Sequence, residues 1–241
     1  MAGKTALLLG ATGATGQKVL TELLQSPDFT KVAEYGRRVT DVGAITSGKD
    51  KLVQKTIDFE KLGEAGLKDG KWDVVFIALG TTRKAAGSAE AFEKIDREYV
   101  INAAREAKAD TPGQRLVYVS SVGANPSSKF LYPKSKGLTE HGLAALGYSD
   151  TIIFRPGFLA GAQRPGQNFL VSAINPLVGL ASYFSNSVQI QISTLAKSIV
   201  AAGKLGSSAL PASVRATEEG KEGTSFTVID NAGALALAAE A

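Results

Sequence analysis

The chain has 241 residues, of which 44% are hydrophobic and 21% are charged, and its formal net charge is +4. This balance is typical of a globular protein, and the length suits one domain over residues 1–241 with a sizeable core. The absence of cysteine excludes disulfides, a thiol nucleophile and a cysteine-based metal site, and a single histidine, His141, excludes a histidine cluster. The basic residues form no tract, so we expect no nucleic-acid partner.

The apolar segments predict no membrane span. The first apolar run begins by Thr5 with no secretory signal before it, so we expect a cytoplasmic protein. The most apolar later stretch, residues 169–184, is short for a span and is interrupted by Asn175 and Pro176. We interpret it as a buried or lid-like segment, or as a surface that contacts a partner or a membrane.

Short apolar runs alternate with helical patterns along the chain. The strand-like runs are residues 5–10, 31–36, 51–59, 72–80, 115–121, 151–157 and 226–230. The helix-like stretches lie near residues 14–25, 89–108, 133–146, 193–204 and 231–241. Such alternation predicts an α/β fold with a doubly wound parallel sheet, the Rossmann fold.

Two segments depart from the alternation. Residues 160–192 interrupt it late in the chain, and we expect them to form a small substrate-side insertion at the carboxyl edge of the sheet. Residues 206–224 are rich in glycine, serine and charge, which predicts an exposed loop.

The first predicted strand runs directly into GATGATG, and a helical pattern follows at once. Glycines in this context allow a tight turn and let the backbone approach a pyrophosphate, while the helix start offers unpaired N–H groups. A glycine-rich turn without a ligand is the alternative, which the position between strand and helix disfavours. We therefore predict that a dinucleotide contacts Gly10, Thr12, Gly13, Ala14, Thr15 and Gly16.

The end of the second predicted strand indicates which dinucleotide is preferred. A site for NAD places an acidic residue there, whereas this chain has Gly36 followed by Arg37 and Arg38. Arginines at this point can pair with a 2′-phosphate, which predicts NADPH as the cofactor. Two alternatives stay open: Glu34 could accept the ribose hydroxyls of NADH, or the two arginines could be solvated surface residues.

Three further segments at the carboxyl edge are predicted to line the cofactor. Asp58 and Phe59 end the third strand and should border the adenine. Small and hydroxylated residues after the fourth strand suit the ribose and phosphates, and the residues after the sixth strand should lie near the nicotinamide. These two segments contribute Leu79, Gly80, Thr81, Thr82, Pro156, Gly157 and Phe158. Taken alone, each small or hydroxylated residue could equally reflect turn chemistry.

The fifth predicted strand brings Ser120 and Ser121 to the same edge, and Tyr132 and Lys136 follow. A Ser–Tyr–Lys set suits carbonyl reduction, in which the nicotinamide supplies hydride and a tyrosine protonates the developing alkoxide. A nearby ammonium brings a tyrosine pKa of about 10 toward neutral pH, and a serine can position the carbonyl oxygen. Strand alternation sends the two serines to opposite sides, and we favour Ser121.

Pro133 bears on how Tyr132 and Lys136 meet. A residue before proline avoids the α region, and proline suits the first helical position, so we expect Tyr132 at the helix cap and Lys136 in the first turn. The pair could alternatively be an aromatic contact at a helix start together with a solvated lysine.

The motifs DFEKL, ALGTTR, KIDREYV, VSSVGAN, SSKFLYPKSKG and FRPG occur in this order. Together with the G-x-x-G-x-x-G spacing of the glycine loop, they resemble the Tat-interactive-protein oxidoreductase family. That group consists of atypical short-chain dehydrogenase/reductases and has fungal relatives associated with the mitochondrial outer membrane. The resemblance implies NADPH binding, Arg37 and Arg38 at the family's Arg-Arg position, and Tyr132 with Lys136 as the active pair. It also implies a peripheral position on that membrane as an alternative to the cytoplasm.

These observations favour an NADPH-dependent carbonyl reductase acting on an aldehyde or ketone. The second hypothesis is a regulatory protein that senses NADPH and binds a partner without turnover. The third is a sugar-nucleotide epimerase or dehydratase with tightly held NAD, which Arg37 and Arg38 disfavour. The aromatic and leucine side chains of residues 160–192 suggest an apolar substrate. A monomer and a homodimer both remain open.

Overall fold

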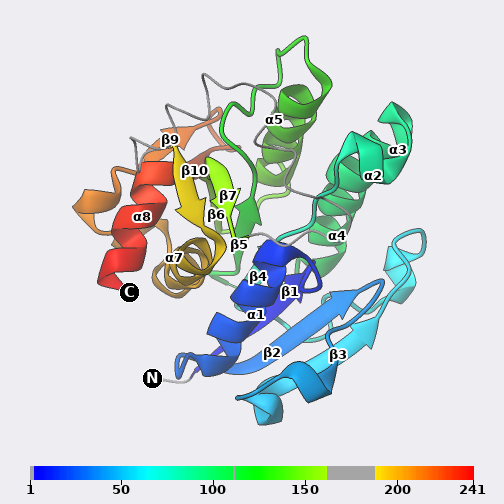
Figure 1. The fold of residues 1–241 in the computed structure, drawn as a ribbon, viewed down its shortest axis with the longest axis vertical. Helices are drawn as coiled ribbons and strands as arrows, with labels where there is room; N and C mark the ends of the chain where they lie inside the picture. The colour runs from blue at the N-terminus through cyan, green and yellow to red at the C-terminus, as the bar shows by residue number, and fades with distance from the viewer. Residues whose placement is uncertain (1–2, 111, 162–187) are drawn as a thin grey trace.

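The computed structural model describes residues 3–110, 112–161 and 188–241. Eight strands form one sheet in the order β3-β2-β1-β4-β5-β6-β10-β9, and every neighbouring pair is parallel except β10 with β9 (Figure 1). The strands of this sheet are β1 Lys4–Leu9, β2 Phe29–Gly36, β3 Leu52–Thr56, β4 Val74–Ile77, β5 Arg115–Val119, β6 Asp150–Arg155, β9 Thr217–Glu219 and β10 Phe226–Asp230. The strand order reverses between β1 and β4, and this confirms the predicted doubly wound Rossmann fold.

Helices cover both faces of the sheet. The α-helices are α1 Ala14–Gln25, α2 Arg83–Ala86, α3 Ala89–Glu93, α4 Tyr99–Ala107, α5 Leu131–Ala144, α7 Ile192–Leu205 and α8 Asn231–Glu240. Short 3₁₀ turns occur at Val42–Ala44, Lys49–Lys51, Leu62–Glu64, Ser207–Ala209 and Ala212–Val214. Helices α1, α7 and α8 pack on one face, and α4 and α5 on the other.

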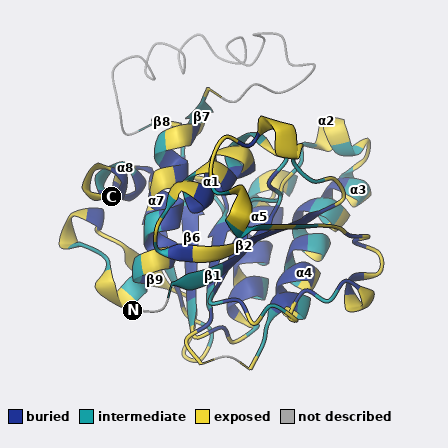
Figure 2. Cartoon of the chain, turned by 90° about the horizontal axis from the view of Figure 1, so that it is seen from below, coloured by how far each residue is buried: buried dark blue, intermediate teal, exposed yellow. Residues whose placement is uncertain are grey.

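The burial of β1 follows from this two-sided cover. Ala6 and Leu8 belong to the core beneath α1 and α7, whereas Leu7 and Leu9 belong to the core beneath α4 and α5. Because successive side chains of a strand point to opposite faces, a strand covered on both sides must be apolar throughout. Figure 2 shows these central strands in the colour of buried residues, between helices that are exposed on their outer sides.

The helix predicted near residues 89–108 is interrupted. Between α3 and α4 the chain forms a π-helical segment, Lys94–Glu98, in which Asp96 is fully buried. Such a wide turn displaces the backbone relative to a regular helix and often occurs at functional sites.

The start of α5 differs from the prediction. Phe130 is the N-cap and the helix begins at Leu131, so Tyr132 and Pro133 both lie in the first turn and Lys136 lies in the second. The prediction that Tyr132 caps the helix was therefore wrong. Proline is tolerated here because N–H groups of a first turn have no intrahelical partner to lose.

Two short strands lie outside the predicted pattern. β7 Phe158–Ala160 pairs in parallel with β8 Gln189–Gln191 at the two ends of the predicted insertion, of which residues 162–187 lie outside the described residues. The loop predicted over residues 206–224 contains β9, which adds to the edge of β10. All three residues of β9 are exposed, so it has no hydrophobic alternation by which a sequence pattern could reveal it.

Within the residues that the structure describes, none of the helices has the length and apolar character needed to cross a membrane.

Candidate active site

The glycine loop joins β1 to α1 at the reversal of strand order. Gly10 has φ +94°, and a Cβ there would lie 2.7 Å from the backbone of Ala78, after β4. Gly16 packs directly against the carbonyl of Gly10, where a side chain would collide. Glycine is thus required at both positions, once for conformation and once for close contact between helix and loop.

The N-terminus of α1 is left open by this loop. Its N-cap is Gly13, so no side chain accepts a hydrogen bond from the first turn, and the turn contains no acidic residue. The N–H groups of the first turn, beginning at Ala14, together with the positive end of the helix dipole, provide the features that bind a pyrophosphate.

The segment after β4 lies between this loop and the candidate catalytic residues. Thr82 is the N-cap of α2, and its hydroxyl oxygen accepts a hydrogen bond of 3.1 Å from the N–H of Ala85. A Cβ on Gly80 would lie 3.5 Å from the Asp96 carboxylate and 3.8 Å from Lys136 Nζ. Thr82 therefore has the capping role that turn chemistry predicted, while Gly80 borders a buried ion pair.

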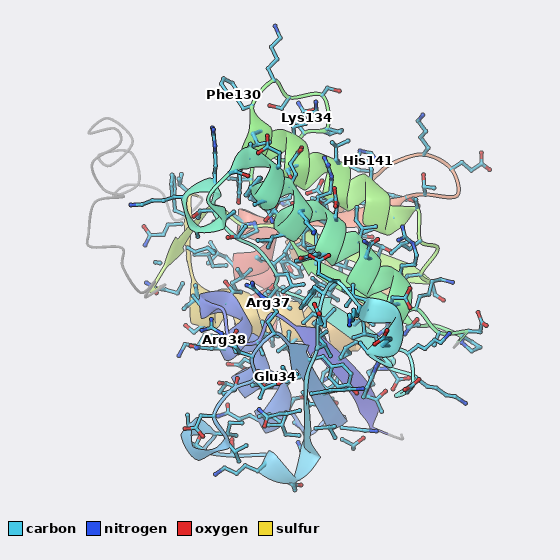
Figure 3. The ribbon with its side chains drawn as sticks, turned by 90° about the vertical axis from the view of Figure 1, so that its right-hand side faces the viewer. Glu34, Arg37, Arg38, Phe130, Lys134 and His141 are labelled. Carbon is cyan, nitrogen blue, oxygen red and sulfur yellow. The ribbon has the colours of Figure 1, made fainter. Side chains whose placement is uncertain are left out.

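Arg37 and Arg38 are exposed at the carboxyl end of β2, whereas Glu34 lies deeper in the strand (Figure 3). Glu34 is 0% exposed, and both of its carboxylate oxygens accept hydrogen bonds, from Thr40 and Gln54. Three hydrogen bonds from within the protein thus hold this buried carboxylate. Glu34 is thus engaged within the protein, whereas the two arginines face solvent.

The end of β3 forms the neighbouring part of this edge. Phe59 is buried, and its ring centroid lies 5.2 Å from that of Tyr99. Tyr99 donates a hydrogen bond to Glu60; this bond and burial raise the pKa of Tyr99, and the positive charges of Lys94 and, to a smaller extent, Arg37 oppose the rise. Asp58 is exposed and accepts a hydrogen bond of 2.9 Å from the N–H of Glu60. The predicted adenine edge and the arginines are therefore neighbours.

Tyr132 and Lys136 lie on the same side of α5. Tyr132 is 46% exposed, and its ring centroid lies 6.0 Å from that of Phe92. Lys136 is only 4% exposed, and its Nζ lies 5.9 Å from the centre of the Tyr132 ring. The lysine is thus a buried cation beside the tyrosine, which contradicts the alternative of a solvated lysine.

Two buried residues hold the ammonium of Lys136. Its Nζ donates a hydrogen bond of 2.9 Å to the Tyr118 hydroxyl and lies 3.1 Å from Asp96 Oδ1. Burial alone would lower the pKa of Lys136, but the oxygens of Tyr118, Asp96 and Tyr132 outweigh it, so the pKa is raised. The pKa of Tyr118 is also raised, in this case by burial, so its phenol is neutral near pH 7. The Asp96 carboxylate is then the group that keeps the lysine charged.

The two serines have different surroundings. Ser120 is 6% exposed and donates a hydrogen bond of 2.5 Å to Glu140 Oε1, which also accepts from Arg155. The hydroxyl of Ser121 is shielded from solvent and has no hydrogen-bond partner among the described residues. Ser120 is thus committed to the fold, whereas Ser121 retains the capacity to bind a ligand oxygen.

The segment after β6 completes this edge. The carbonyl of the buried Pro156 accepts a hydrogen bond of 2.9 Å from the N–H of Val122. Gly157 packs against the Val188 carbonyl too closely for any side chain, and Phe158 is 53% exposed. The Val122–Pro156 hydrogen bond joins the chain after β6 to the chain after β5, beside the serines, and Gly157 contacts the residue that precedes β8.

His141 lies apart from this site. It is exposed further along α5 than Phe130 and Lys134 (Figure 3), and its ring meets Phe226 edge to face at 5.5 Å. His141 is therefore a surface residue. The described residues bring together no group of three His, Cys, Asp or Glu side chains that could hold a metal ion.

Sequence reasoning missed three residues of the site: Asp96, Tyr118 and Glu140. Each is 0% exposed and contacts a predicted residue distant in sequence. Asp96 and Glu140 could have been suspected as charged residues inside helical patterns with buried neighbours, but Tyr118 reads as an ordinary strand aromatic.

The fold and this edge define an NAD(P)-binding Rossmann protein of the short-chain dehydrogenase/reductase type. The model of a family described as NAD(P)H-binding matches residues 10–176. The chain is 39% identical to Protein FMP52-1, mitochondrial, of Scheffersomyces stipitis over 181 residues, which are 74% of this chain and 76% of that protein. It is 38% identical to Protein HTATIP2 of Rattus norvegicus over 170 residues, 69% of each chain. The chain therefore belongs to the NAD(P)H-binding family, in the atypical short-chain dehydrogenase/reductase group that contains the FMP52 and HTATIP2 proteins.

Solved structures are similar in fold. A thiolation-reductase di-domain from an archaeal non-ribosomal peptide synthetase aligns with a TM-score of 0.63 at 19% identity, over 85% of this chain and 54% of that one. The Bordetella bronchiseptica enzyme WbmH, solved in complex with NAD+, aligns with a TM-score of 0.61 at 18% identity, over 84% of this chain and 73% of that one. At these identities the likeness concerns the fold alone.

Proposed function

We propose that this protein is an NADPH-dependent carbonyl reductase that reduces an aldehyde or ketone to an alcohol, with Tyr132 as the proton donor. The observation that carries the proposal is the buried ammonium of Lys136 beside the Tyr132 ring, 5.9 Å from its centre. A buried cation at that position stabilises the negative charge that Tyr132 acquires when it releases its proton.

The chemistry assigns each group a separate task. When bound, NADPH would supply the hydride that the carbonyl carbon of the substrate accepts, and NADP+ would be the oxidised product. Tyr132 gives its hydroxyl proton to the carbonyl oxygen, which takes up the electron pair of the C=O bond, and the tyrosinate later regains a proton from water. Ser121 donates a hydrogen bond to the same oxygen and orients it. Lys136 remains protonated throughout, held by Asp96.

The preference for NADPH rests on the end of β2. Arg37 and Arg38 are exposed there, and Glu34, the acidic side chain that could favour NADH, is fully buried and hydrogen-bonded. Replacing both arginines with alanine should weaken NADPH binding by about 1–3 kcal/mol, the range of lost charge-assisted hydrogen bonds, and leave NADH binding unchanged. Equal losses for the two cofactors in titration calorimetry would contradict a 2′-phosphate site.

An apolar substrate is part of the proposal. Apolar side chains are exposed along the edge that carries Tyr132 and the segment after β6. They are Val122 at 65%, Phe130 at 77% and Phe158 at 53% exposure. Phe158→Ser should raise KM for a long-chain aldehyde more than for a short polar one.

The decisive experiment measures NADPH consumption with a panel of aliphatic, aromatic and polar carbonyl compounds. Tyr132→Phe should lower turnover by about 10²–10⁴-fold, the range for loss of a general acid, while cofactor binding persists. Tyr148→Phe is the matched control, because it removes a buried tyrosine hydroxyl, bonded to the Ala104 carbonyl at 2.6 Å, away from the site. Full turnover in Tyr132→Phe would exclude this tyrosine as the proton donor.

Two observations favour a second candidate, an NADPH-binding sensor without turnover. Lys136 donates its described hydrogen bond to Tyr118, and the Ser121 hydroxyl is shielded from solvent. A sensor would bind NADPH equally well in the wild type and in Tyr132→Phe, and neither protein would consume it with any compound of the panel.

A further inference from the structure

Glu34 is a buried carboxylate that the proposed chemistry does not use. Its Oε1 accepts two hydrogen bonds of 2.8 Å from Thr40, one from the N–H and one from the hydroxyl. Its Oε2 accepts a hydrogen bond of 2.7 Å from Gln54 Nε2 on β3. A buried carboxylate needs such donors because it has lost its water.

Gln54 closes this arrangement. The same Nε2 donates a second hydrogen bond of 2.7 Å to the carbonyl of Thr40. The N–H, hydroxyl and carbonyl of Thr40 are therefore all bound within one cluster, which we call the Glu34–Thr40–Gln54 clamp. It ties a point in the loop after β2 to two neighbouring strands of the sheet.

The other end of the loop is also held. The carbonyl of Gly36 accepts a hydrogen bond of 2.9 Å from the N–H of Ile57, after β3. The backbone then turns so tightly that a Cβ on Gly36 would lie 2.9 Å from the Arg38 carbonyl. Arg37 and Arg38 thus stand, exposed, on a short backbone segment fixed at Gly36 and at Thr40.

We infer that the Glu34–Thr40–Gln54 clamp determines cofactor specificity by holding the backbone that presents Arg37 and Arg38 to the 2′-phosphate of NADPH. This inference rests on the proposed function. The reason is entropic: exposed arginines on a free loop must be ordered when the phosphate binds, whereas arginines on a fixed backbone lose less freedom. Glu34, an acidic residue on β2, would thus favour phosphate binding indirectly, by fixing the backbone that carries the arginines.

The test compares two ligands that differ by one phosphate, 2′,5′-ADP and 5′-AMP, in titration calorimetry with the full chain. Gln54→Met and Thr40→Val should each weaken 2′,5′-ADP binding by about fivefold to tenfold. This is the loss expected if the loop of the variant adopts the binding-competent conformation about 10–20% of the time. The affinity for 5′-AMP should change by less than about twofold, because its phosphate binds elsewhere, at the glycine loop.

Two controls separate specificity from stability. Thr40→Ser keeps the hydroxyl and should retain the wild-type ratio of affinities. Gln114→Met removes another side-chain amide that links two segments, beside β5. This amide donates a hydrogen bond of 3.1 Å to the Ala107 carbonyl and accepts one of 3.0 Å from the N–H of Ala109. It should lower the melting temperature as Gln54→Met does and leave the ratio unchanged. If Gln54→Met does not fold, the Thr40→Val and Thr40→Ser pair decides.

The outcomes distinguish this inference from the proposed function. Loss of the preference for 2′,5′-ADP in Gln54→Met and Thr40→Val, but not in the controls, supports the clamp. If Arg37→Ala/Arg38→Ala loses the preference while Gln54→Met and Thr40→Val keep it, the inference is overturned and the NADPH preference stands. If the wild type binds the two ligands equally, both the inference about the clamp and the NADPH preference are overturned.

Discussion

Two charged clusters lie one turn apart on α5, and they are built differently. Around Glu140, both carboxylate oxygens are used, by Ser120 and by two nitrogens of Arg155, and Arg155 forms two further hydrogen bonds with Glu219. Around Lys136, the pairing is incomplete, because Asp96 Oδ2 has no hydrogen-bond partner among the described residues.

The difference distinguishes a cluster that stabilises the fold from a cluster that borders the candidate active site. The Glu140 cluster joins α5 to β6 and to the edge strand β9, and each of its carboxylate oxygens is hydrogen-bonded within it. The Lys136 cluster borders Gly80, in the loop predicted to contact the cofactor, and keeps polar capacity unused. A fully satisfied buried cluster stabilises one structure, whereas an unsatisfied group in a native protein calls for a functional explanation.

The largest expected effect comes from breaking the Glu140 cluster. Glu140→Ala leaves Arg155, whose pKa is raised by hydrogen bonds to Glu140 and Glu219 against the effect of burial, with one carboxylate instead of two. We expect a loss of about 3–5 kcal/mol in the free energy of unfolding, measured by urea denaturation. Glu218→Ala, on the exposed β9, is the control and should change it by less than about 0.5 kcal/mol. A loss below that limit in Glu140→Ala would show that the cluster does not stabilise the fold.

Asp96→Asn tests the Lys136 cluster and should cost about 1–3 kcal/mol near pH 7. In the wild type the raised pKa of Lys136 means that its contribution to stability is present at neutral pH and is lost only as pH rises above the usual lysine range. Without the carboxylate, burial should lower the pKa of Lys136 below that of the unfolded chain. The variant should then gain stability relative to the wild type as pH rises toward the usual lysine range, because the unfolded chain there binds more protons than the folded one.

The same variant should also change the pH dependence of turnover. The alkaline limb of the kcat/KM profile should move to lower pH, because the ammonium beside Tyr132 is lost earlier. An unchanged profile together with lowered stability would assign Asp96 to the fold alone.

Tyr118→Phe should have the smallest effect. It removes the hydroxyl that accepts from Lys136 and keeps the ring, so we expect a loss of about 0.5–1.5 kcal/mol in stability and a decrease of a few fold in turnover. Tyr148→Phe should cost similar stability, since its hydroxyl is also buried and bonded, without a change in turnover. Equal turnover in the two variants would remove Tyr118 from the positioning of Lys136.

Local patterns were sufficient for the order of elements and for the glycine loop. The runs that predicted β1 and β10 and the pattern that predicted α1 match the observed elements to within one residue, because apolar character and glycine placement are properties of short segments. The patterns failed for β9, which is exposed and pairs only through its backbone, and for the start of α5, where proline was compatible with more than one helical position.

The candidate site was predicted only in part, since its residues were identified by type and edge but not by partner. The sequence could place Ser120 and Ser121 at the end of β5, yet their difference depends on Glu140, twenty positions away in the chain. It left Glu34 open as a ribose acceptor, and only the tertiary structure shows that Thr40 and Gln54 hydrogen-bond this carboxylate.

The sequence by itself determined the Rossmann fold, its glycine loop and the residue types at the carboxyl edge, because these depend on periodicity and on single conformational requirements such as the positive φ of Gly10. Only the tertiary structure decided that Lys136 is a buried cation, that Glu34 is a clamp and that Ser120 is engaged. Those properties arise from contacts between residues distant in the chain, which set burial and hydrogen-bond partners and thereby the chemistry that each side chain can perform.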